Sequence, residues 1–115
     1  MPGSSEQSII VNVWVVSDGN QGELLDALVA LFERLRRLEG FIDGQILEGV
    51  DRMLFVSYAT MRSARDRDAA FEDSEVRATM RRIGGIAHPR PHAYTLARSF
   101  TPAASEPVAS EPPAG

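Results

Sequence analysis

Residues 35–60 read LRRLEGFIDGQILEGVDRMLFVSYAT, which contains the end of a helix, a Gly-Phe corner and two short strand-like runs. Gly40 suits the C-terminal end of a helix, because glycine tolerates a left-handed backbone without a steric clash. Residues 41–48 and 53–59 flank a Gly-Val-Asp-Arg turn. This pattern predicts a β-hairpin that directly follows a helix.

Helices and strands alternate on both sides of this stretch. Apolar residues at helical spacing predict an amphipathic helix that starts at Asn20, where Glu23 completes a capping-box pattern, and continues through Leu38. A second helical region is expected to break near residues 72–74, where Asp73 or Ser74 can cap a new helix. The remaining strands are predicted at residues 9–16 and 92–100.

The resulting order, β-α-β-β-α-β, is the split βαβ or ferredoxin-like motif of the α+β class, a four-stranded antiparallel sheet with two helices on one face. The first strand is apolar on both faces, with Ile9, Val11, Val13 and Val15 on one face and Ile10, Trp14 and Val16 on the other. Helices can cover only one of these faces, and large exposed apolar patches are rare in monomers. We therefore expect a homodimer, paired sheet to sheet as in a dimeric α+β barrel.

Length and composition favour a single small domain. With 115 residues, 43% of them apolar, the chain can form one core, which we place at residues 8–100. Residues 1–7 are expected to form a flexible N-terminus, and residues 101–115, rich in Pro, Ala, Ser and Glu, a disordered tail.

Charge and residue usage exclude several classes of function. The net charge of -4 argues against a nucleic-acid partner, which needs a basic face. No segment approaches the roughly 18 consecutive apolar residues of a membrane-spanning helix, so no membrane role is expected. The sequence has no cysteine, which excludes disulfides and thiolate metal sites and is compatible with a cytoplasmic protein.

Asn12 interrupts a strand that is otherwise apolar. Burying an amide without a partner costs about 1 to 3 kcal/mol, so Asn12 should bind either a neighbouring loop or a ligand. Trp14 shares its face and could provide an aromatic wall beside this amide, or it could belong to the core. In an active site, such an amide could stabilise a developing oxyanion.

Other polar candidates lie on the third and last strands. Ser57 shares a face with Phe55 and could line the same pocket, although no nucleophile-elbow sequence surrounds the serine. His92 could act as a general base on a face shared with Tyr94, or it could anchor a loop. His92 and His88 flank two prolines that exclude a helix, so their spacing does not predict a metal site.

Charged residues gather around residues 62–73. We interpret Arg67 and its neighbours there as a solvated helix face, with an arginine that binds an acidic ligand as the alternative. Phe71, in the same region, is apolar and could help to line or fill a pocket.

Three segments together resemble the antibiotic biosynthesis monooxygenase superfamily. They are Leu38-Glu39-Gly40-Phe41, the strand FVSYATMRS at residues 55–63, and Ile83-Gly84-Gly85-Ile86 before a proline-rich link. The resemblance spans about residues 9–100. It implies an obligate dimer with a pocket between sheet and helices in each subunit, and in many members cofactor-free oxygenation of an electron-rich aromatic polyketide.

The sequence departs from two motifs of that superfamily. Anthrone-oxygenating members carry Asn-Tyr-x-x-Trp on the third strand, and the matching positions here are Ser57-Tyr58-Ala59-Thr60-Met61. Haem-degrading members use an Asn, a Trp and an axial His, where this chain has Asn12, Phe71 and Arg81, so haem cleavage is not expected. No cofactor or metal is expected.

The resemblance therefore predicts a cofactor-independent monooxygenase that tailors a small aromatic polyketide or similar phenolic metabolite. Asn12, Ser57 and His92 are the candidate catalytic residues, and the candidate substrate-binding residues are Trp14, Phe55, Phe71 and Tyr94. Two alternatives stay open. One is a polyketide cyclase or isomerase that uses the same pocket, and the other is a non-catalytic ligand-binding dimer.

Overall fold

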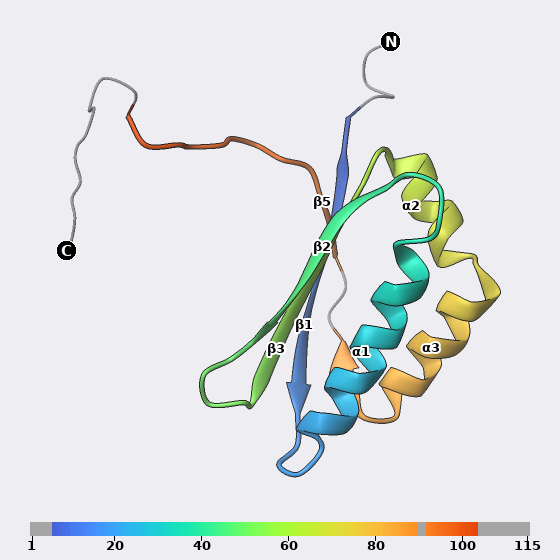
Figure 1. The fold of residues 1–115 in the computed structure, drawn as a ribbon, viewed down its shortest axis with the longest axis vertical. Helices are drawn as coiled ribbons and strands as arrows, with labels where there is room; N and C mark the ends of the chain where they lie inside the picture. Colours follow the sequence, from blue (N-terminus) through green and yellow to red (C-terminus); the bar gives the residue numbers. More distant parts are fainter. Residues whose placement is uncertain (1–5, 90–91, 104–115) are drawn as a thin grey trace.

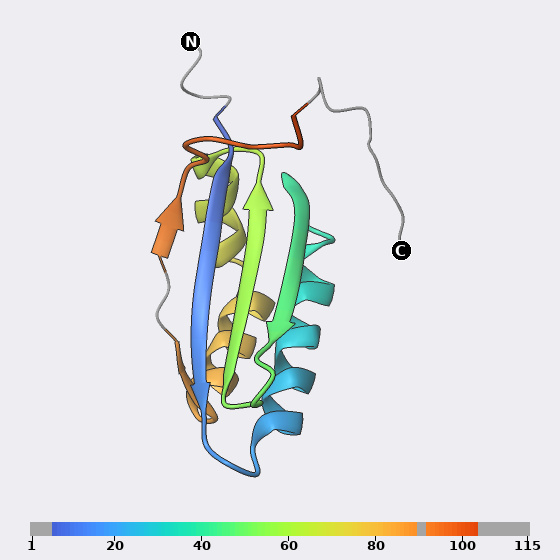
Figure 2. The same ribbon diagram turned by 90° about the vertical axis from the view of Figure 1, so that its left-hand side faces the viewer.

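The computed structural model describes residues 6–89 and 92–103, and it shows one sheet covered on one face by helices (Figures 1 and 2). The predicted α+β order is confirmed, including the break in the second helical region. The elements are β1 (Ser8–Val16), α1 (Gln21–Leu35), β2 (Phe41–Glu48), β3 (Leu54–Met61), α2 (Ala64–Phe71), α3 (Ser74–Gly84), β4 (Ala87–Pro89) and β5 (His92–Tyr94).

The sheet is antiparallel with β1 near its centre. Its order is β2-β3-β1-β4, and β5 also pairs with β1. β4 pairs with one end of β1, at residues 14–16, and β5 with the other, at residues 9–11. The two short strands are therefore successive segments of one edge strand, and the ferredoxin-like topology is confirmed.

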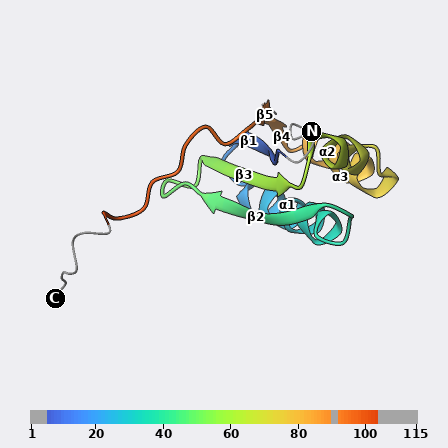
Figure 3. The same cartoon turned by 90° about the horizontal axis from the view of Figure 1, so that it is seen from above.

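The prediction of a single last strand at residues 92–100 was wrong. Pairing starts earlier, at Ala87, and it stops at Tyr94. Tyr94 lies opposite Ile9, so only Ser8 of β1 remains beyond it. Residues 95–103 therefore overshoot the end of β1 and lie exposed without secondary structure. Figure 3 shows this segment extending away from the two layers.

The predicted ends of the first helix also need correction. Asn20 is the N-cap residue of α1, but its side chain makes no capping hydrogen bond. The helix ends at Leu35 instead of Leu38, because the hydrogen bonds tighten there. The N–H groups of Arg37 and Leu38 each donate to the carbonyl three residues back, 3.0 Å away, which forms turns in place of another helical turn.

Gly40 makes the corner between α1 and β2. Its φ is +89°, and a Cβ at this position would lie 2.5 Å from the Asp66 side chain of α2. Its carbonyl accepts from the N–H of Arg62 at 2.7 Å. Arg62 also binds Asp66, with 2.8 Å between Nε and Oδ2. The corner needs glycine both for its backbone conformation and for the close approach of α2.

The core lies between the sheet and the helix layer. In β1, burial alternates with a period of two, so that Ser8, Ile10, Asn12, Trp14 and Val16 face the helices. The opposite face of β1 is half-buried or exposed in the isolated subunit, and we call it the open face. No helix in residues 6–89 and 92–103 is both long and apolar enough to span a lipid bilayer. Helix residues that complete the core are Leu24, Ala27, Leu28, Leu31, Leu35, Ala70, Val76 and Ile83.

The predicted flexible N-terminus and disordered tail lie mostly outside the described residues. This applies to residues 1–5 at the N-terminus and to residues 104–115 at the C-terminus. Within the described part, residues 101–103 are exposed and have no regular structure.

Candidate functional site

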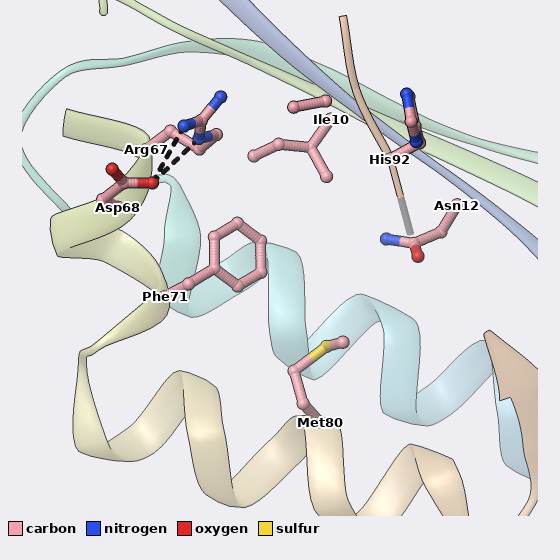
Figure 4. Close-up of a pocket in the computed structure, with 8 residues that line it drawn as sticks. Ile10, Asn12, Arg67, Asp68, Phe71, Met80 and His92 are labelled. Carbon is pink, nitrogen blue, oxygen red and sulfur yellow. Dashed lines mark hydrogen bonds and ion pairs between the residues drawn. The ribbon is translucent and has the colours of Figure 1, made fainter. Parts of the chain in front are cut away.

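A cavity of about 370 Å³ opens between the sheet and the helix layer, near β5 and α2 (Figure 4). This volume falls in the range of roughly 300 to 1,000 Å³ that is typical of small-molecule sites. Apolar side chains from β1, α2 and α3 form much of its surface. The residues that line it are Ile10, Asn12, Arg67, Asp68, Phe71, Met80, His92 and Ala93.

Asn12 is the polar group on the β1 wall of this cavity. The alternation of β1 turns its side chain toward the helices, where it is only 5% exposed. Within the described part of the chain, its Oδ1 is buried and has no hydrogen-bond partner. An unpaired buried carbonyl costs about 1 to 3 kcal/mol, so this atom is suited to accept a hydrogen bond from a ligand.

Ser57 and Trp14 form a hydrogen-bonded pair beside Asn12. Trp14 Nε1 donates to Ser57 Oγ at 3.0 Å, and both side chains are almost completely buried. Ser57 is also the direct cross-strand partner of Asn12 in the β1–β3 ladder. The structure thus brings together two of the three candidate catalytic residues, and it places Trp14 in the core behind them.

A second, much narrower space continues behind Asn12. Its volume is about 10 Å³, and it shares Ile10, Asn12 and Phe71 with the larger cavity. Its other walls come from α1 and from β3. They are Leu31, Phe32, Leu35, Ser57 and Ala59.

Phe71, which the sequence predicts as substrate-binding, lines both spaces. Phe55 and Trp14 are fully buried and belong to the core cluster, outside the set of side chains that line either space. Phe71 can therefore contact a ligand directly. Phe55 and Trp14 support the wall from behind.

His92 and Tyr94 lie together, as predicted, but on the open face of the sheet. Their rings are 4.9 Å apart between centroids and are tilted by 57°. The register places His92 opposite Val11 and Tyr94 opposite Ile9, so both side chains share the face that turns away from the helices. His92 contributes to the rim of the cavity, and Figure 4 shows its ring pointing away from the helices. The His92 ring and the Asn12 side chain therefore point to opposite faces of the sheet, although both residues border the cavity.

Arg67 is a cavity residue that the sequence interpretation assigned to a solvated face. Its Nη1 donates to Ser8 Oγ at 2.9 Å, and its Nε donates to Asp68 Oδ1 at 3.0 Å. These bonds hold the guanidinium at the α2 end of the cavity. One signal could have found it: Arg67 and Phe71 are four residues apart on a helix, so they share a face.

Met80 and Ile10 were also missed as cavity residues. Met80 lies on the sheet-facing side of α3, and Ile10 precedes Asn12 by two positions on the same face of β1. The position of Ile10 at the cavity could have been predicted from the two-residue period of the strand, once Asn12 was placed there. Met80 shares the apolar face of α3 with Val76 and Ile83 at helical spacing, so its contact with the core follows from the sequence, but its position at the cavity depends on how α3 packs.

The carboxyl groups whose pKa is shifted lie outside this cavity. Hydrogen bonds from Arg34, and next from the N–H of Val76, lower the pKa of Asp73 to about 2. Arg34 Nη2 lies 2.8 Å from Asp73 Oδ1, which ties α1 to the start of α3. The pKa of Asp66 is lowered mainly by its hydrogen bond to Arg62. The first shift arises from an ion pair that fastens α1 to α3, and the second from one that fastens the turn between β3 and α2 to α2.

Across residues 6–89 and 92–103, no group of three or more His, Cys, Asp or Glu side chains is arranged to hold a metal ion.

Comparison with known proteins identifies the fold. No protein-family model matches the sequence, and no curated protein shows significant sequence similarity to it. Among solved structures, SnoaB, a cofactor-independent oxygenase from Streptomyces nogalater, aligns with a TM-score of 0.77 and 16% identity, covering 85% of this chain and 99% of SnoaB. The chain has the fold of that protein.

Two further structures support the same conclusion. A protein from Nitrosomonas europaea, proposed to be an antibiotic biosynthesis monooxygenase, aligns with a TM-score of 0.73 and 15% identity over 84% of this chain and 96% of that one. A conserved protein of unknown function from Bacteroides thetaiotaomicron aligns with a TM-score of 0.76 and 16% identity, covering 81% of this chain and 100% of that one. The predicted structural likeness to the monooxygenase superfamily is thereby confirmed at the level of fold.

Proposed function

We propose that the protein is a cofactor-independent monooxygenase that oxidises a phenolic, polyketide-like aromatic molecule. The observation that carries this proposal is the buried Oδ1 of Asn12, which has no hydrogen-bond partner among the described residues and lies in the wall of an otherwise largely apolar cavity. An aromatic ring system can occupy the apolar surface formed by Ile10, Phe71 and Met80. A substrate hydroxyl can then donate to Asn12 Oδ1 and fix the ring relative to the wall.

The net reaction needs only dioxygen as the oxidant. One oxygen atom replaces two hydrogens at an activated ring methylene and becomes a carbonyl, and the other oxygen leaves with those two hydrogens as water. An electron-rich phenolic ring supplies the electrons. The contribution of the protein is to bind and orient the substrate and to stabilise the enolate form from which electrons pass to dioxygen.

Arg67 and Asn12 divide this work between the two ends of the cavity. Arg67 offers a positive charge at the α2 end, where it can stabilise a phenolate or enolate oxygen. Asn12 holds a hydroxyl at the β1 wall. His92 remains a candidate base for a substrate group that reaches the open face, because its ring lies on that side of the sheet.

We further propose that two subunits associate through the open face. This face carries several apolar side chains that are exposed in one subunit, among them Val15, 53% exposed, and Leu54, 42% exposed. Burial of both against a second copy removes an apolar patch that monomers rarely tolerate. Tyr58, which the register places on the same face, would then lie in the interface.

Oxygen consumption with a dihydroxyanthrone tests the activity. We expect dioxygen uptake and formation of the quinone above the rate of a protein-free control, which corrects for spontaneous oxidation. Absence of any enhancement with a panel of anthrones and naphthols would argue against an oxygenase.

A cyclase or isomerase is the second candidate, and one observation favours it. The third-strand positions that are Asn and Trp in anthrone-oxygenating proteins are Ser57 and Met61 here, and both are buried. Such an enzyme would convert a polyketide substrate without consuming dioxygen. Tight binding with no conversion would instead indicate a ligand-binding dimer.

A further inference from the structure

The narrow space behind Asn12 has the size of a single small molecule. Its volume of about 10 Å³ is close to the minimum that holds one water, and it is too small for any part of an aromatic ring. It adjoins the larger cavity, because Asn12 and Phe71 line both. A ring bound in the large cavity can therefore extend one small substituent into this space.

Two polar groups line this space side by side. Asn12 contributes an acceptor, since its Oδ1 has no partner among the described residues. Ser57 Oγ already accepts from Trp14 Nε1 at 3.0 Å, so the serine hydroxyl is free to donate in another direction. The two residues are direct cross-strand partners on the helix-facing side, which places their Cβ atoms about 4.5 to 5.5 Å apart.

We propose that this space is an oxygen subsite, which binds one water in the resting protein and the distal oxygen of a substrate hydroperoxide during turnover. This assignment rests on the proposed oxygenase function. Asn12 Oδ1 has two lone pairs, so a hydroperoxide O–H can donate to one while the substrate hydroxyl donates to the other, and the distal hydroperoxide oxygen accepts from the Ser57 hydroxyl. The remaining walls, such as Leu31 and Leu35, are apolar and exclude a second polar group.

This binding mode assists the step that completes the reaction. The carbon that bears the hydroperoxide loses its proton to solvent, and the electron pair of that C–H bond forms the second bond of the carbonyl. The O–O bond breaks at the same time, and the distal oxygen departs with the O–O electron pair. One proton from solvent converts it to water. The Ser57 hydroxyl stabilises the charge that develops on the leaving oxygen.

Filling the subsite is the direct test. Ala59 lines this space on β3, is only 3% exposed and does not line the large cavity. Ala59→Val should block the small space without touching the aromatic site. Ala87→Val on β4 is a matched control, because Ala87 is similarly buried, lies in a strand and lines neither space.

The measurements are turnover as a function of dioxygen concentration and affinity for the aromatic substrate under anaerobic conditions. We expect Ala59→Val to lower the dioxygen-dependent rate by about ten-fold or more, with aromatic affinity within about two-fold of the unmodified protein. The control should change neither. An unaltered dioxygen-dependent rate in Ala59→Val, or an equal loss of aromatic affinity, would overturn the assignment.

A second variant and a crystal structure keep the test independent of folding and of the proposed activity. Ser57→Ala removes the donor but keeps the space, and it should lower the same rate. In a high-resolution crystal structure, a water should bridge Asn12 Oδ1 and Ser57 Oγ and should disappear in Ala59→Val. If no phenol is oxidised at all, the catalytic role fails with the proposed function, and the crystal structure alone decides whether the subsite exists. A crystal structure of the unmodified protein with no water between Asn12 Oδ1 and Ser57 Oγ would refute the subsite.

Discussion

Asn12 shows how much a single residue can reveal before the structure is known. A polar side chain in a continuous apolar strand must find a partner, and the period of two places it on the same face as Trp14. In the structure, Asn12 and Trp14 do lie on the same face of β1. Sequence could not show that the partner is missing within the described residues, because this depends on which side chains of α1 and α2 approach β1.

We expect Asn12→Ala to lower turnover by about ten-fold or more, because the substrate loses the hydrogen-bonding group that orients it. The free energy of unfolding should change by less than about 1 kcal/mol, since the Oδ1 of Asn12 has no partner to strand within the described residues. Steady-state kinetics and chemical denaturation of the same preparation test both parts. A loss of about 1 to 3 kcal/mol with intact turnover would show that Asn12 is structural.

Arg67 illustrates the limit of inference at the same scale. Other charged residues surround it between residues 62 and 73, and their mixed signs are typical of a solvated face. The structure turns this one side chain toward Ser8, at the beginning of β1, and so toward the cavity. The direction depends on the docking of α2 against the sheet, which the helix sequence alone does not determine.

Arg67→Met should weaken binding of a phenolate by about ten-fold, the scale expected for a lost charge-assisted hydrogen bond. Calorimetric titration with a phenol above its own pKa, and with its methyl ether, measures the effect. The ether carries no charge, so its affinity should change by less than about two-fold. The control is Arg65→Met, because Arg65 is an exposed residue of the same helix, α2. Equal losses for both ligands would mean that Arg67 only shapes the cavity.

At the scale of elements, the sequence predicted what local patterns determine. The β-hairpin, the amphipathic α1 and the break between α2 and α3 all depend on residues close in the chain, and all were correct. The last strand and the end of α1 were wrong. The extent of the last strand depends on how much of β1 remains unpaired, which is a property of the whole sheet.

Gly40 tests the corner that joins α1 to the sheet. Gly40→Ala should lower the free energy of unfolding by more than about 1 kcal/mol, because its positive φ and the nearby Asp66 side chain both oppose a Cβ. Gly22→Ala is the matched control. Gly22 lies within α1, and apart from its chain neighbours and its own helix backbone no described atom lies within 4 Å of the position that an added methyl group would take. This variant should therefore be neutral or stabilising by about 0.5 kcal/mol. Similar losses in both variants would contradict this account of the corner.

Asp73 links α1 to α3 through its ion pair with Arg34, so we expect the stability of the protein to depend on pH in the acid range. Its pKa is lowered from 3.8 to about 2, chiefly by Arg34, so its ion pair contributes stability above the unfolded-state value. That contribution is lost as the pH falls from about 4 through about 2. Asp73→Asn keeps a capping residue but removes the charge. We expect a lower melting temperature at pH 7 and a smaller loss of stability on acidification in this window.

Thermal melts between pH 7 and pH 2 test this dependence, with Asp26→Asn on the exposed face of α1 as the control for net charge. The control should respond to acid like the unmodified protein. If the melting temperature of Asp73→Asn also falls with acid as it does in the unmodified protein, the Arg34–Asp73 pair does not contribute measurably to stability.

At the scale of the whole molecule, the two faces of the sheet have different surroundings. Helices bury one face, which contains Trp14 at 0% exposure, whereas the other face leaves Val15 53% exposed and Leu54 42% exposed. Sequence predicted this asymmetry from a strand that is apolar on both sides. It could not predict that His92 and Tyr94 lie on the open face, because that depends on the register of β5 against β1.

Two valines of similar exposure give a test of association through the open face. Val15 lies on that face and is 53% exposed in the subunit, and Val29 lies on α1 and is 45% exposed. In an isolated subunit, aspartate at either position would remain in water and change stability little. In a sheet-to-sheet dimer, aspartate at position 15 would be buried without a partner, which costs several kcal/mol. Only Val15→Asp should therefore impair association.

Sedimentation over a range of micromolar concentrations measures this effect. We expect the unmodified protein and Val29→Asp to sediment as dimers, and Val15→Asp as a monomer whose melting temperature no longer depends on protein concentration. One face of β1 belongs to the open face, and the other carries Asn12. Loss of the dimer should therefore also reduce turnover, because β1 would no longer hold Asn12 in the same position. A folded monomer of the unmodified protein, or a dimer that tolerates Val15→Asp, would exclude this interface.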